Sequence, residues 1–297
     1  MEPLDICAVL VTFNPDHRLM ESLHCLVNQV GHIVVVDNNS SSSMASYLAA
    51  VCQDLNITLL LNHKNQGIAA ALNTGVDFAL QNGFQWVYTL DQDSVIFPDT
   101  ISNILICYSK YPKKESLAII GTNYLEQTIH SGPATAEFDE STFWVKQKLI
   151  ITSGSLLSLD SYRRVGPFKE DLFLYYVDHE YCLRLGLAGY DLILACKAHM
   201  AHSTGRCEIR SFLGKKVVVL NYDPWKHFYI ARNGFLLVRM YFLVEPRWCL
   251  LRVLVQLKRF MNTIFFERDK LPKFYFIVKG IFAAAENVVT NEIGPAA

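Results

Sequence analysis

Two aspartates stand two residues apart directly after a short apolar run. The run is Trp86–Leu90, and Asp91 and Asp93 follow it. Because side chains two apart on an extended chain point the same way, we expect both carboxylates to face one spot where a strand ends. Two such ligands suit a hard cation, Mg²⁺ or Mn²⁺, which in turn would hold a diphosphate. The alternative is a solvated turn in which Asp93 or Ser94 caps a helix that begins near Pro98.

A third candidate acid, Asp178, follows an aromatic-rich stretch at residues 172–177. We expect a helix from Asp178 to Ala188, so that Asp178 lies at the N-cap or in the first turn, where backbone N–H groups favour a carboxylate. One interpretation is a general base at the mouth of the same cleft. The other is a structural cap, followed by an ordinary exposed Glu180.

One histidine is a candidate metal ligand. His202 stands in a polar His-Ser-Thr-Gly loop after an expected strand at residues 192–195. From there its imidazole could reach a cation. A lone histidine is more often structural than a ligand, so this assignment depends on what the fold brings near it.

Buried strands alternate with helices over the first part of the chain. Continuous apolar, β-branched runs predict strands at 6–13, 33–36, 57–61, 86–90 and 117–120. Helices are expected at 44–53, 69–80 and 99–110. Short connections between such elements predict an α/β fold with a parallel, doubly wound sheet over residues 1–121.

Four polar clusters share one predicted edge of that sheet. They are Thr12-Phe13-Asn14, Asp37, Asn65–Gly67 and the Asp91–Asp93 pair. In open α/β sheets, ligands bind outside the carboxyl ends of the strands, which is where all four fall. The chain contains neither GxGxxG nor GxxxxGK[ST], so a dinucleotide or P-loop site is disfavoured.

The charge of the chain is unevenly distributed. The 297 residues carry a formal net charge of -1 and give no argument for binding nucleic acid. Residues 226–279, however, contain eleven Lys and Arg against three acids. This asymmetry predicts a neutral-to-acidic catalytic body followed by a basic, apolar C-terminal region.

The C-terminal region predicts long helices. After Pro246, one helical face carries Leu250, Leu254, Leu257, Met261 and Ile264, and the opposite face carries Arg252, Gln256, Arg259 and Thr263. One interpretation is a set of helices packed on the core or on a partner subunit, as in a homo-oligomer. The other is an interfacial membrane anchor with basic residues on anionic lipid.

Other features indicate a reducing compartment. None of the eight cysteines forms a CxxC pair, and several lie in apolar runs. No secretory signal opens the chain, and no uninterrupted apolar stretch reaches the ~18 residues of a spanning helix. Residues 122–148 lack periodicity and predict an irregular excursion. Gly154, within the strand-like 149–157, indicates either a ligand wall or a bulge.

As an ordered set, these motifs resemble family 2 inverting nucleotide-sugar glycosyltransferases with the GT-A fold, and most of all the bacterial rhamnosyltransferases of O-antigen and cell-wall polysaccharide assembly. The resemblance spans residues 6–235. The motifs that carry it are Val11–Pro15, Val36–Ser40, Asn65–Ala69, Ala71–Gly75, Leu90–Ser94, Tyr176–Arg184 and Arg232-Asn233. The Asp-Gln-Asp-Ser form of the fifth motif points toward rhamnose.

The resemblance implies roles for the donor-site residues. Thr12, Phe13 and Asn14 would line the base and ribose pocket, and Asp37 would hydrogen-bond the nucleoside. Asn65 and Gly67 would lie beside the ribose and diphosphate, and Asp91 nearest the ribose. For the cation, Asp93 would be the main ligand, with Asp91 beside it and His202 as a further ligand.

It also implies the catalytic acids. Asp178 matches the catalytic carboxylate. Many relatives carry two acids in a row here, whereas this chain has Val177 before Asp178. This leaves Asp178 as the base and Glu180 as an acceptor-orienting residue, although the two roles could be exchanged.

The implied protein has a GT-A, Rossmann-like catalytic domain at 1–222, with a nucleotide-sugar half at 1–121 and an acceptor half at 122–222. A basic amphipathic helical region follows at 223–297. Its donor would be dTDP-L-rhamnose and its acceptor a polyprenyl-diphosphate-linked glycan at the inner face of the cytoplasmic membrane. This implies a cytoplasmic enzyme that is peripherally attached to the inner membrane. A UDP-hexose transferase and a non-catalytic sugar-nucleotide-binding protein are the alternatives.

Overall fold

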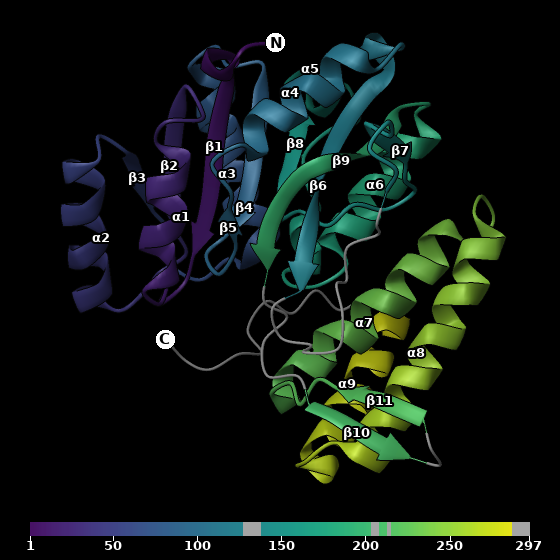
Figure 1. Cartoon of the computed structure of the whole chain (residues 1–297). Helices are drawn as coiled ribbons and strands as arrows, with labels where there is room; N and C mark the ends of the chain where they lie inside the picture. Colours follow the sequence, from purple (N-terminus) through teal and green to yellow (C-terminus); the bar gives the residue numbers. More distant parts are fainter. Residues whose placement is uncertain (127–137, 203–207, 213–214, 287–297) are drawn as a thin grey trace.

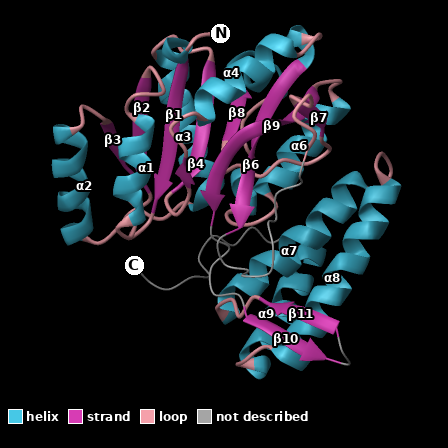
Figure 2. Cartoon of the chain, in the orientation of Figure 1, coloured by secondary structure: helices cyan, strands magenta, loops and turns pink. Residues whose placement is uncertain are grey.

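The computed structural model describes residues 1–126, 138–202, 208–212 and 215–286 (Figure 1). An α/β body contains one mixed sheet, and three long helices follow it, on the side where β6 and β9 end (Figure 2). A sheet with helices on both faces, followed by a helical extension, confirms the fold class predicted from the sequence.

The four strands that carry the predicted polar clusters are parallel neighbours. They are β1 (Ile6–Thr12), β2 (His32–Asp37), β3 (Thr58–Leu61) and β4 (Trp86–Asp91), in the spatial order β3-β2-β1-β4. Their carboxyl ends therefore meet at one edge, as predicted. Burial on both faces explains the continuous apolar sequence of β1, all of whose residues are buried.

Beyond β4 the sheet is mixed, so the parallel sheet expected over residues 1–121 is interrupted before its last strand, and the whole sheet is mostly parallel. The short strand β8 (Ser155–Ser158) lies antiparallel between β4 and β6 (Leu117–Glu126). Next comes β9 (Asp191–His202), parallel to β6, and it also pairs antiparallel with β5 (Val95–Ile96) and β7 (Trp144–Lys146). Apolar periodicity identified β6 as a strand, but it carries no information about which neighbour pairs with it.

Helices cover both faces of the sheet. One face packs against α1 (Arg18–Leu26), α2 (Ser42–Asp54) and α4 (Thr100–Lys110). The other packs against α3 (Gly67–Gln81), α5 (Leu159–Val165) and α6 (Val177–Leu187). Short 3₁₀ turns lie at Pro3–Asp5, Lys114–Ser116 and Glu170–Leu172. Helix α4 is preceded by Asp99, and Ser94 is fully buried, so the alternative that Asp93 or Ser94 caps this helix is wrong.

The C-terminal region contains a hairpin and three helices. The hairpin is β10 (Glu208–Phe212) with β11 (Lys215–Val219), and the helices are α7 (Pro224–Tyr241), α8 (Pro246–Phe266) and α9 (Lys270–Glu286). Helix α7 joins the body through Tyr241, whose hydroxyl donates to the Glu180 carboxylate at 3.0 Å. Because α7 packs directly on α6, this contact does not separate a C-terminal unit from the body. The domain boundary expected after residue 222 stays a prediction.

Helix α8 buries the face that carries two of its polar residues and exposes the face that carries its leucines. Its polar residues Gln256 and Thr263 are buried, whereas Leu250, Leu254 and Leu257 are each more than half exposed. Gln256 donates to the Ile230 carbonyl at 2.7 Å, which satisfies its buried amide nitrogen. Helix α8 thus packs on the chain through Trp248, Cys249 and Phe260, while its leucine face stays exposed. Contact of that face with a partner subunit or with a lipid surface stays a prediction.

Gly154 and the cysteines were also singled out in the sequence. Gly154 lies in a turn directly before β8, with φ +73°, and an added Cβ would lie 2.3 Å from the sulfur of Met200, so its backbone packs closely against β9. Cys7, Cys25, Cys52, Cys107, Cys182, Cys196 and Cys249 are free thiols, all buried or half-buried. Cys207 lies outside the described residues. None of the helices in the described ranges is long and apolar enough to span a bilayer.

Candidate active site

At the donor edge of the sheet, Asp37 joins the ends of β1 and β2. Its carboxylate is 1% exposed and accepts hydrogen bonds from the Thr12 hydroxyl (3.0 Å), the Ser40 hydroxyl (2.5 Å) and the Ser40 amide (2.9 Å). Ser40 in turn accepts from the Asn14 amide at 2.7 Å. Thr12, Asn14 and Asp37 are thus brought together, and the carboxylate holds the shape of the edge.

Asn38 organises the neighbouring loop, and sequence reasoning missed it. Its amide nitrogen donates to the Asn65 side chain (2.9 Å) and the Gly67 carbonyl (3.2 Å). Its amide oxygen accepts from Asn62 (3.1 Å) and from the Gln66 amide (3.0 Å). An amide directly after the acid at the end of a buried strand was the available signal. Both ends of the Asn38 amide are used, so Asn65 and Gly67 are held against the end of β2.

Gln92, the residue between the two aspartates, is a second missed element. Its side-chain oxygen accepts from the Phe13 amide at 2.7 Å, and its nitrogen donates to the Phe13 carbonyl at 3.3 Å. This two-point contact fixes the end of β1 beside the acid pair. Asp91 also donates its backbone N–H to the Ser153 hydroxyl at 3.0 Å, which connects the end of β4 to the segment just before β8.

Three carboxylates from distant parts of the sequence influence one another at this edge. Burial raises the pKa of Asp91 to about 7, and the negative charges of Asp93 and Asp178 act in the same direction. Asp178 also lines a pocket together with Thr89, which lies two residues before Asp91 on β4. That the carboxylates of Asp91, Asp93 and Asp178 face one ion stays a prediction.

Asp178 lies in the first turn of α6, as predicted, and its partner is the next residue. One oxygen accepts from the His179 amide (2.8 Å) and contacts the His179 ring nitrogen Nδ1 (2.9 Å). Burial raises the pKa of Asp178, but the charge and hydrogen bonds of His179 outweigh burial and leave that pKa below its ordinary value. Asp178 is thus ionised at neutral pH, whereas Asp91, with a pKa of about 7, is only partly ionised. Such a difference in pKa between two nearby acids is typical of a site where one of them acts as a base.

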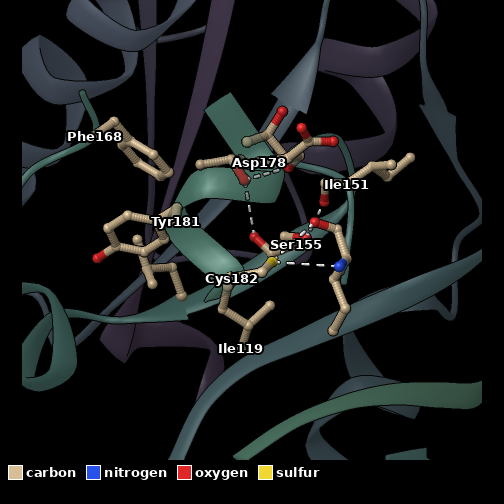
Figure 3. A pocket seen from close by; sticks show the side chains of 11 residues that line it. Ile119, Ile151, Ser155, Phe168, Asp178, Tyr181 and Cys182 are labelled. Carbon is tan, nitrogen blue, oxygen red and sulfur yellow. Dashed lines mark hydrogen bonds between the residues drawn. The ribbon is translucent and has the colours of Figure 1, made fainter. Parts of the chain in front are cut away.

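Asp178 lines a small pocket (Figure 3). Its wall combines the apolar side chains of Ile119 from β6, Phe168 from the loop after α5 and Tyr181 from α6 with the polar Thr89 and Ser155. Cys182, one turn after Asp178, contacts the Ile150 backbone at 3.3 Å through its sulfur. These contacts pack α6 onto the segment around Ile150.

Glu180 is not brought to this group. Its side chain is 0% exposed and binds the Arg184 guanidinium through both oxygens, at 3.0 and 2.8 Å. It also accepts the Tyr241 hydroxyl at 3.0 Å. Two residues apart on a helix, Asp178 and Glu180 point in different directions, so Glu180 is turned into the α6–α7 contact. This placement argues against both the acceptor-orienting and the exchanged role expected from the sequence.

The residues at the edge fit a divalent cation in their chemistry. Burial and, to a smaller extent, the negative charge of Asp93 raise the pKa of Asp91, and a bound cation would relieve this repulsion. The pKa of Arg18 is raised mainly by its hydrogen bond to Asp16 and, to a smaller extent, by the negative charge of Asp93. Across the described residues, no three His, Cys, Asp or Glu side chains form a ready-made metal cluster. The backbone of His202 ends β9, and its side chain lies outside what the structure describes.

Comparison with known proteins finds a family match in the first part of the chain. The model of the family described as glycosyl transferase family 2 matches residues 7–118, which contain all four polar clusters of the edge. Over these residues the chain is similar to family 2 glycosyltransferases. Asp178, Glu180 and the C-terminal helices lie beyond the matched residues.

Relatives extend the likeness over most of this glycosyltransferase. The dTDP-rhamnosyl transferase RfbF of Shigella flexneri is 29% identical over 254 residues, which cover 79% of this chain and 80% of that protein. The galactofuranosyltransferase GlfT1 of Mycobacterium tuberculosis is 25% identical over 257 residues, covering 81% of this chain and 83% of that protein.

Solved structures share the fold of this glycosyltransferase. Mannosyltransferase PcManGT from Pyrobaculum calidifontis, in complex with GDP-Man and Mn²⁺, superposes with a TM-score of 0.54 at 14% identity, covering 98% of this chain and 88% of that one. GalNAc-T7 with UDP, GalNAc and Mn²⁺ gives a TM-score of 0.57 at 13% identity over 77% of this chain. The chain spans half the length of GalNAc-T7.

Proposed function

We propose that this glycosyltransferase transfers L-rhamnose from dTDP-L-rhamnose to a hydroxyl of a lipid-linked glycan, with inversion at the anomeric carbon, in the synthesis of O-antigen or another cell-surface polysaccharide. The observation that carries the chemistry is that Asp178 lines a pocket together with Thr89 of β4, the strand that ends at Asp91. The likeness to a dTDP-rhamnosyl transferase over 79% of the chain supports the donor.

The donor would lie along the edge of the sheet. We assign Thr12, Phe13 and Asn14 to the base and ribose pocket, with Asp37 on the nucleoside. Asn65 and Gly67 take the ribose and diphosphate side. The hydrogen bonds of Asp37 and Asn38 support this assignment, because they fix the loops before any ligand arrives and so lower the entropy lost on binding.

Asp178 would act as the general base. An ionised carboxylate at the mouth of the cleft can take the proton of the acceptor hydroxyl as its oxygen attacks the anomeric carbon. The C–O bond to the diphosphate breaks as the new glycosidic bond forms, and one such displacement turns a β-linked donor into an α-rhamnoside. The lowered pKa of Asp178 supports this role because the carboxylate remains unprotonated at neutral pH.

Asp93 and Asp91, with His202 as a further candidate, would hold a Mg²⁺ or Mn²⁺ ion. When bound, that ion would stabilise the charge developing on the leaving diphosphate. The acids of this chain would contribute independently by placing the diphosphate opposite Asp178, so that only the face away from the nucleotide is open to the acceptor.

We further propose that the C-terminal helices rest on an anionic membrane surface in the cytoplasm, beside the polyprenyl-diphosphate-linked acceptor. The outward face of α8 and α9 is apolar and exposed at Leu250, Leu251, Leu254, Leu257, Met261, Phe265, Leu271 and Phe274. Exposed basic residues border it, including Arg247, Lys258 and Lys270. Apolar side chains flanked by Lys and Arg suit an anionic bilayer interface.

Donor identity is tested by thermal unfolding with dTDP-L-rhamnose, UDP-galactose, UDP-galactofuranose and UDP-GlcNAc, each with Mn²⁺. A ligand that binds the native state raises its Tm, by mass action. We expect the largest rise with dTDP-L-rhamnose, together with release of dTDP when a lipid-linked glycan is added. A larger rise with a UDP-sugar would overturn the donor, and the 25% identity to a galactofuranosyltransferase makes UDP-galactofuranose the principal competitor. Binding without turnover would indicate a non-catalytic protein.

The membrane surface is tested by flotation with vesicles of phosphatidylglycerol and phosphatidylcholine, against vesicles of phosphatidylcholine alone. Leu254→Glu places a charge in the centre of the apolar face and should abolish flotation with the anionic vesicles. Failure of the unmodified protein to float, together with a dimeric mass in light scattering, would assign the face to a second copy of this chain.

A further inference from the structure

The segment that leads into Asp178 has an unusual backbone. Phe173, Tyr175 and Tyr176 have φ values of 58°, 65° and 65°, a left-handed region that bulky side chains rarely adopt. At Phe173 the ψ is -63°, and the Leu174 amide donates to the Leu172 carbonyl at 2.6 Å. This combination is the classic γ-turn, a rare and strained conformation. Such a backbone persists only where surrounding contacts hold it.

The contacts that hold it come from two adjacent residues of α7, about sixty positions later. The Asn233 amide nitrogen donates to the carbonyls of Leu172 (2.7 Å), Leu174 (2.8 Å) and Tyr175 (3.0 Å). Arg232 donates to the carbonyls of Asp171 (2.5 Å) and Leu172 (3.3 Å). Four carbonyls of one short segment are thus turned toward this pair.

The pair is built as a unit. The Arg232 Nε donates to the Asn233 side-chain oxygen at 2.9 Å, which fixes the amide so that its nitrogen faces the segment. Both side chains are 0% exposed, and the Arg232 guanidinium lies over the rings of Phe228 and Tyr229, at 5.5 and 5.1 Å. Because so many donors are buried, a change of rotamer would leave several of them unpaired.

The remaining carbonyl of the segment points to the donor side. Phe173 accepts the Ile68 amide at 2.7 Å, next to Gly67. Two residues after Tyr175 the chain enters α6, where the Tyr176 carbonyl accepts the Glu180 amide at 2.9 Å and so fixes the first turn. One strained segment therefore connects the donor loop, the first turn of α6 and α7.

We propose that Arg232 and Asn233 are positioning residues for Asp178, and that they act by holding residues 171–176 in the strained conformation that places Asp178 opposite the donor. This inference rests on the proposed role of Asp178 as base. It gives the C-terminal helices a part in catalysis that is separate from any contact with a membrane.

The test compares two isosteric variants with two matched controls. Asn233→Asp replaces the donating nitrogen with an oxygen that repels the carbonyls, and Gln256→Glu makes the same change at a buried amide that donates to α7 instead. Arg232→Lys removes the fork that reaches Asn233, and Arg239→Lys makes the same change where α7 contacts α9 at 3.3 Å. For each protein, kcat, donor KM, the pH profile of kcat and hydrogen exchange of residues 171–178 are measured.

We expect Asn233→Asp and Arg232→Lys to lower kcat at least ~50-fold, with donor KM within ~3-fold, and to shift the acid limb of the pH profile. Exchange of the 171–178 amides should rise at least ~10-fold, and both controls should match the unmodified protein in kcat and exchange. Unchanged exchange, or an equal loss of kcat in the controls, would overturn the proposal. So would failure of both variants to fold while the controls fold, since the pair would then be a general requirement for folding. Exchange needs no substrate, so a wrong donor leaves that result intact.

Discussion

The donor edge and the segment before α6 deliver acids to the same place by different means. At the donor edge, Asp91 ends a regular strand, Asp93 lies in the turn after it, and short-range contacts such as that of Asp37 with Ser40 complete the loops. At the other side, Asp178 follows a strained segment that is held by Arg232 and Asn233 from α7. The first arrangement follows from local structure, whereas the second exists only when the C-terminal helices are in place.

The comparison shows that fixed geometry at one site can have two physical origins. Parallel strands place their carboxyl ends together without strain, so the donor edge needs only side chains that satisfy one another. A first-turn carboxylate that must face that edge needs an irregular entry into α6, and the irregular entry needs outside support. Variants on the two sides should therefore fail differently, and the following four changes, from largest effect to smallest, measure how.

Asp178→Asn should lower kcat by about 10³-fold, because a general base contributes on the order of 10²–10⁴. The stabilisation by dTDP-L-rhamnose in thermal unfolding should remain, since the donor edge is intact. Asp160→Asn, at an exposed acid that pairs with Arg164, is the control and should leave kcat unchanged. Turnover within threefold of the unmodified protein would exclude Asp178 as the base.

Glu180→Gln should act on stability instead. It leaves the largely buried Arg184 without its carboxylate and places an amide NH₂ against the guanidinium, at a cost of about 3 kcal/mol. Thermal unfolding should show a Tm lower by roughly 6–12 °C, with kcat at low temperature within about threefold. Loss of kcat at unchanged Tm would return Glu180 to an acceptor-orienting role. Asp160→Asn removes the acid of an exposed Asp–Arg pair that has the same four-residue spacing, and it should leave Tm nearly unchanged.

Gly67→Ala tests the contact between the two regions. The new Cβ would lie 2.5 Å from the Phe173 carbonyl oxygen, at φ +86°. Gly83→Ala is the matched control, because Gly83 has φ +80° and nothing within 4 Å of the added atom. Both pay for a positive φ, and only Gly67→Ala displaces Phe173, so chemical denaturation should show about 2 kcal/mol of extra destabilisation. Equal losses in the two variants would mean that the donor loop and the segment are independent.

Asp91→Asn should stabilise the metal-free protein above neutral pH. Burial raises the pKa of Asp91 to about 7 from an ordinary value of 3.8. The folded state thus binds more protons between those values, and stability falls as pH rises through the window. We expect the variant to match the unmodified protein near pH 4 and to exceed it by about 1 kcal/mol, or roughly 2–4 °C in Tm, at pH 8.

A cation should reverse the order. With Mn²⁺ at pH 8, Asp91 of the unmodified protein is ionised and its Tm should rise, whereas the variant should respond less. A Tm difference that does not depend on pH, or an equal response to Mn²⁺, would remove Asp91 from the group of interacting acids.

Sequence patterns predicted the donor edge well for a physical reason. Buried parallel strands have continuous apolar sequences, and the polar residues that follow them must lie at one edge, so Thr12, Asp37 and Asp91 were found. Asn38 and Gln92 were missed although they stand beside predicted residues. Their role depends on which backbone groups face them, and spacing alone does not determine that.

The acceptor half was less predictable. The position of Asp178 in the first turn of α6 was correct, because capping preferences are local. The burial of Glu180 depends on Tyr241 of α7, and the insertion of β8 beside β4 depends on residues 155–158. The inverted orientation of α8 was unpredictable for a related reason, since an amphipathic sequence defines two faces without indicating which one is covered.

The position of β8 also bears on how the polypeptide is made. In the described sheet, β6 pairs only with β8 and β9, and β4 has β8 on its second side. A nascent chain that has left the ribosome as far as residue 126 therefore exposes the unpaired edge of β4 and a β6 strand with neither partner, both prone to aggregate. Although residues 7–118 match a family model, translation must proceed past residue 158 before β4 is enclosed, and past residue 202 before β6 is.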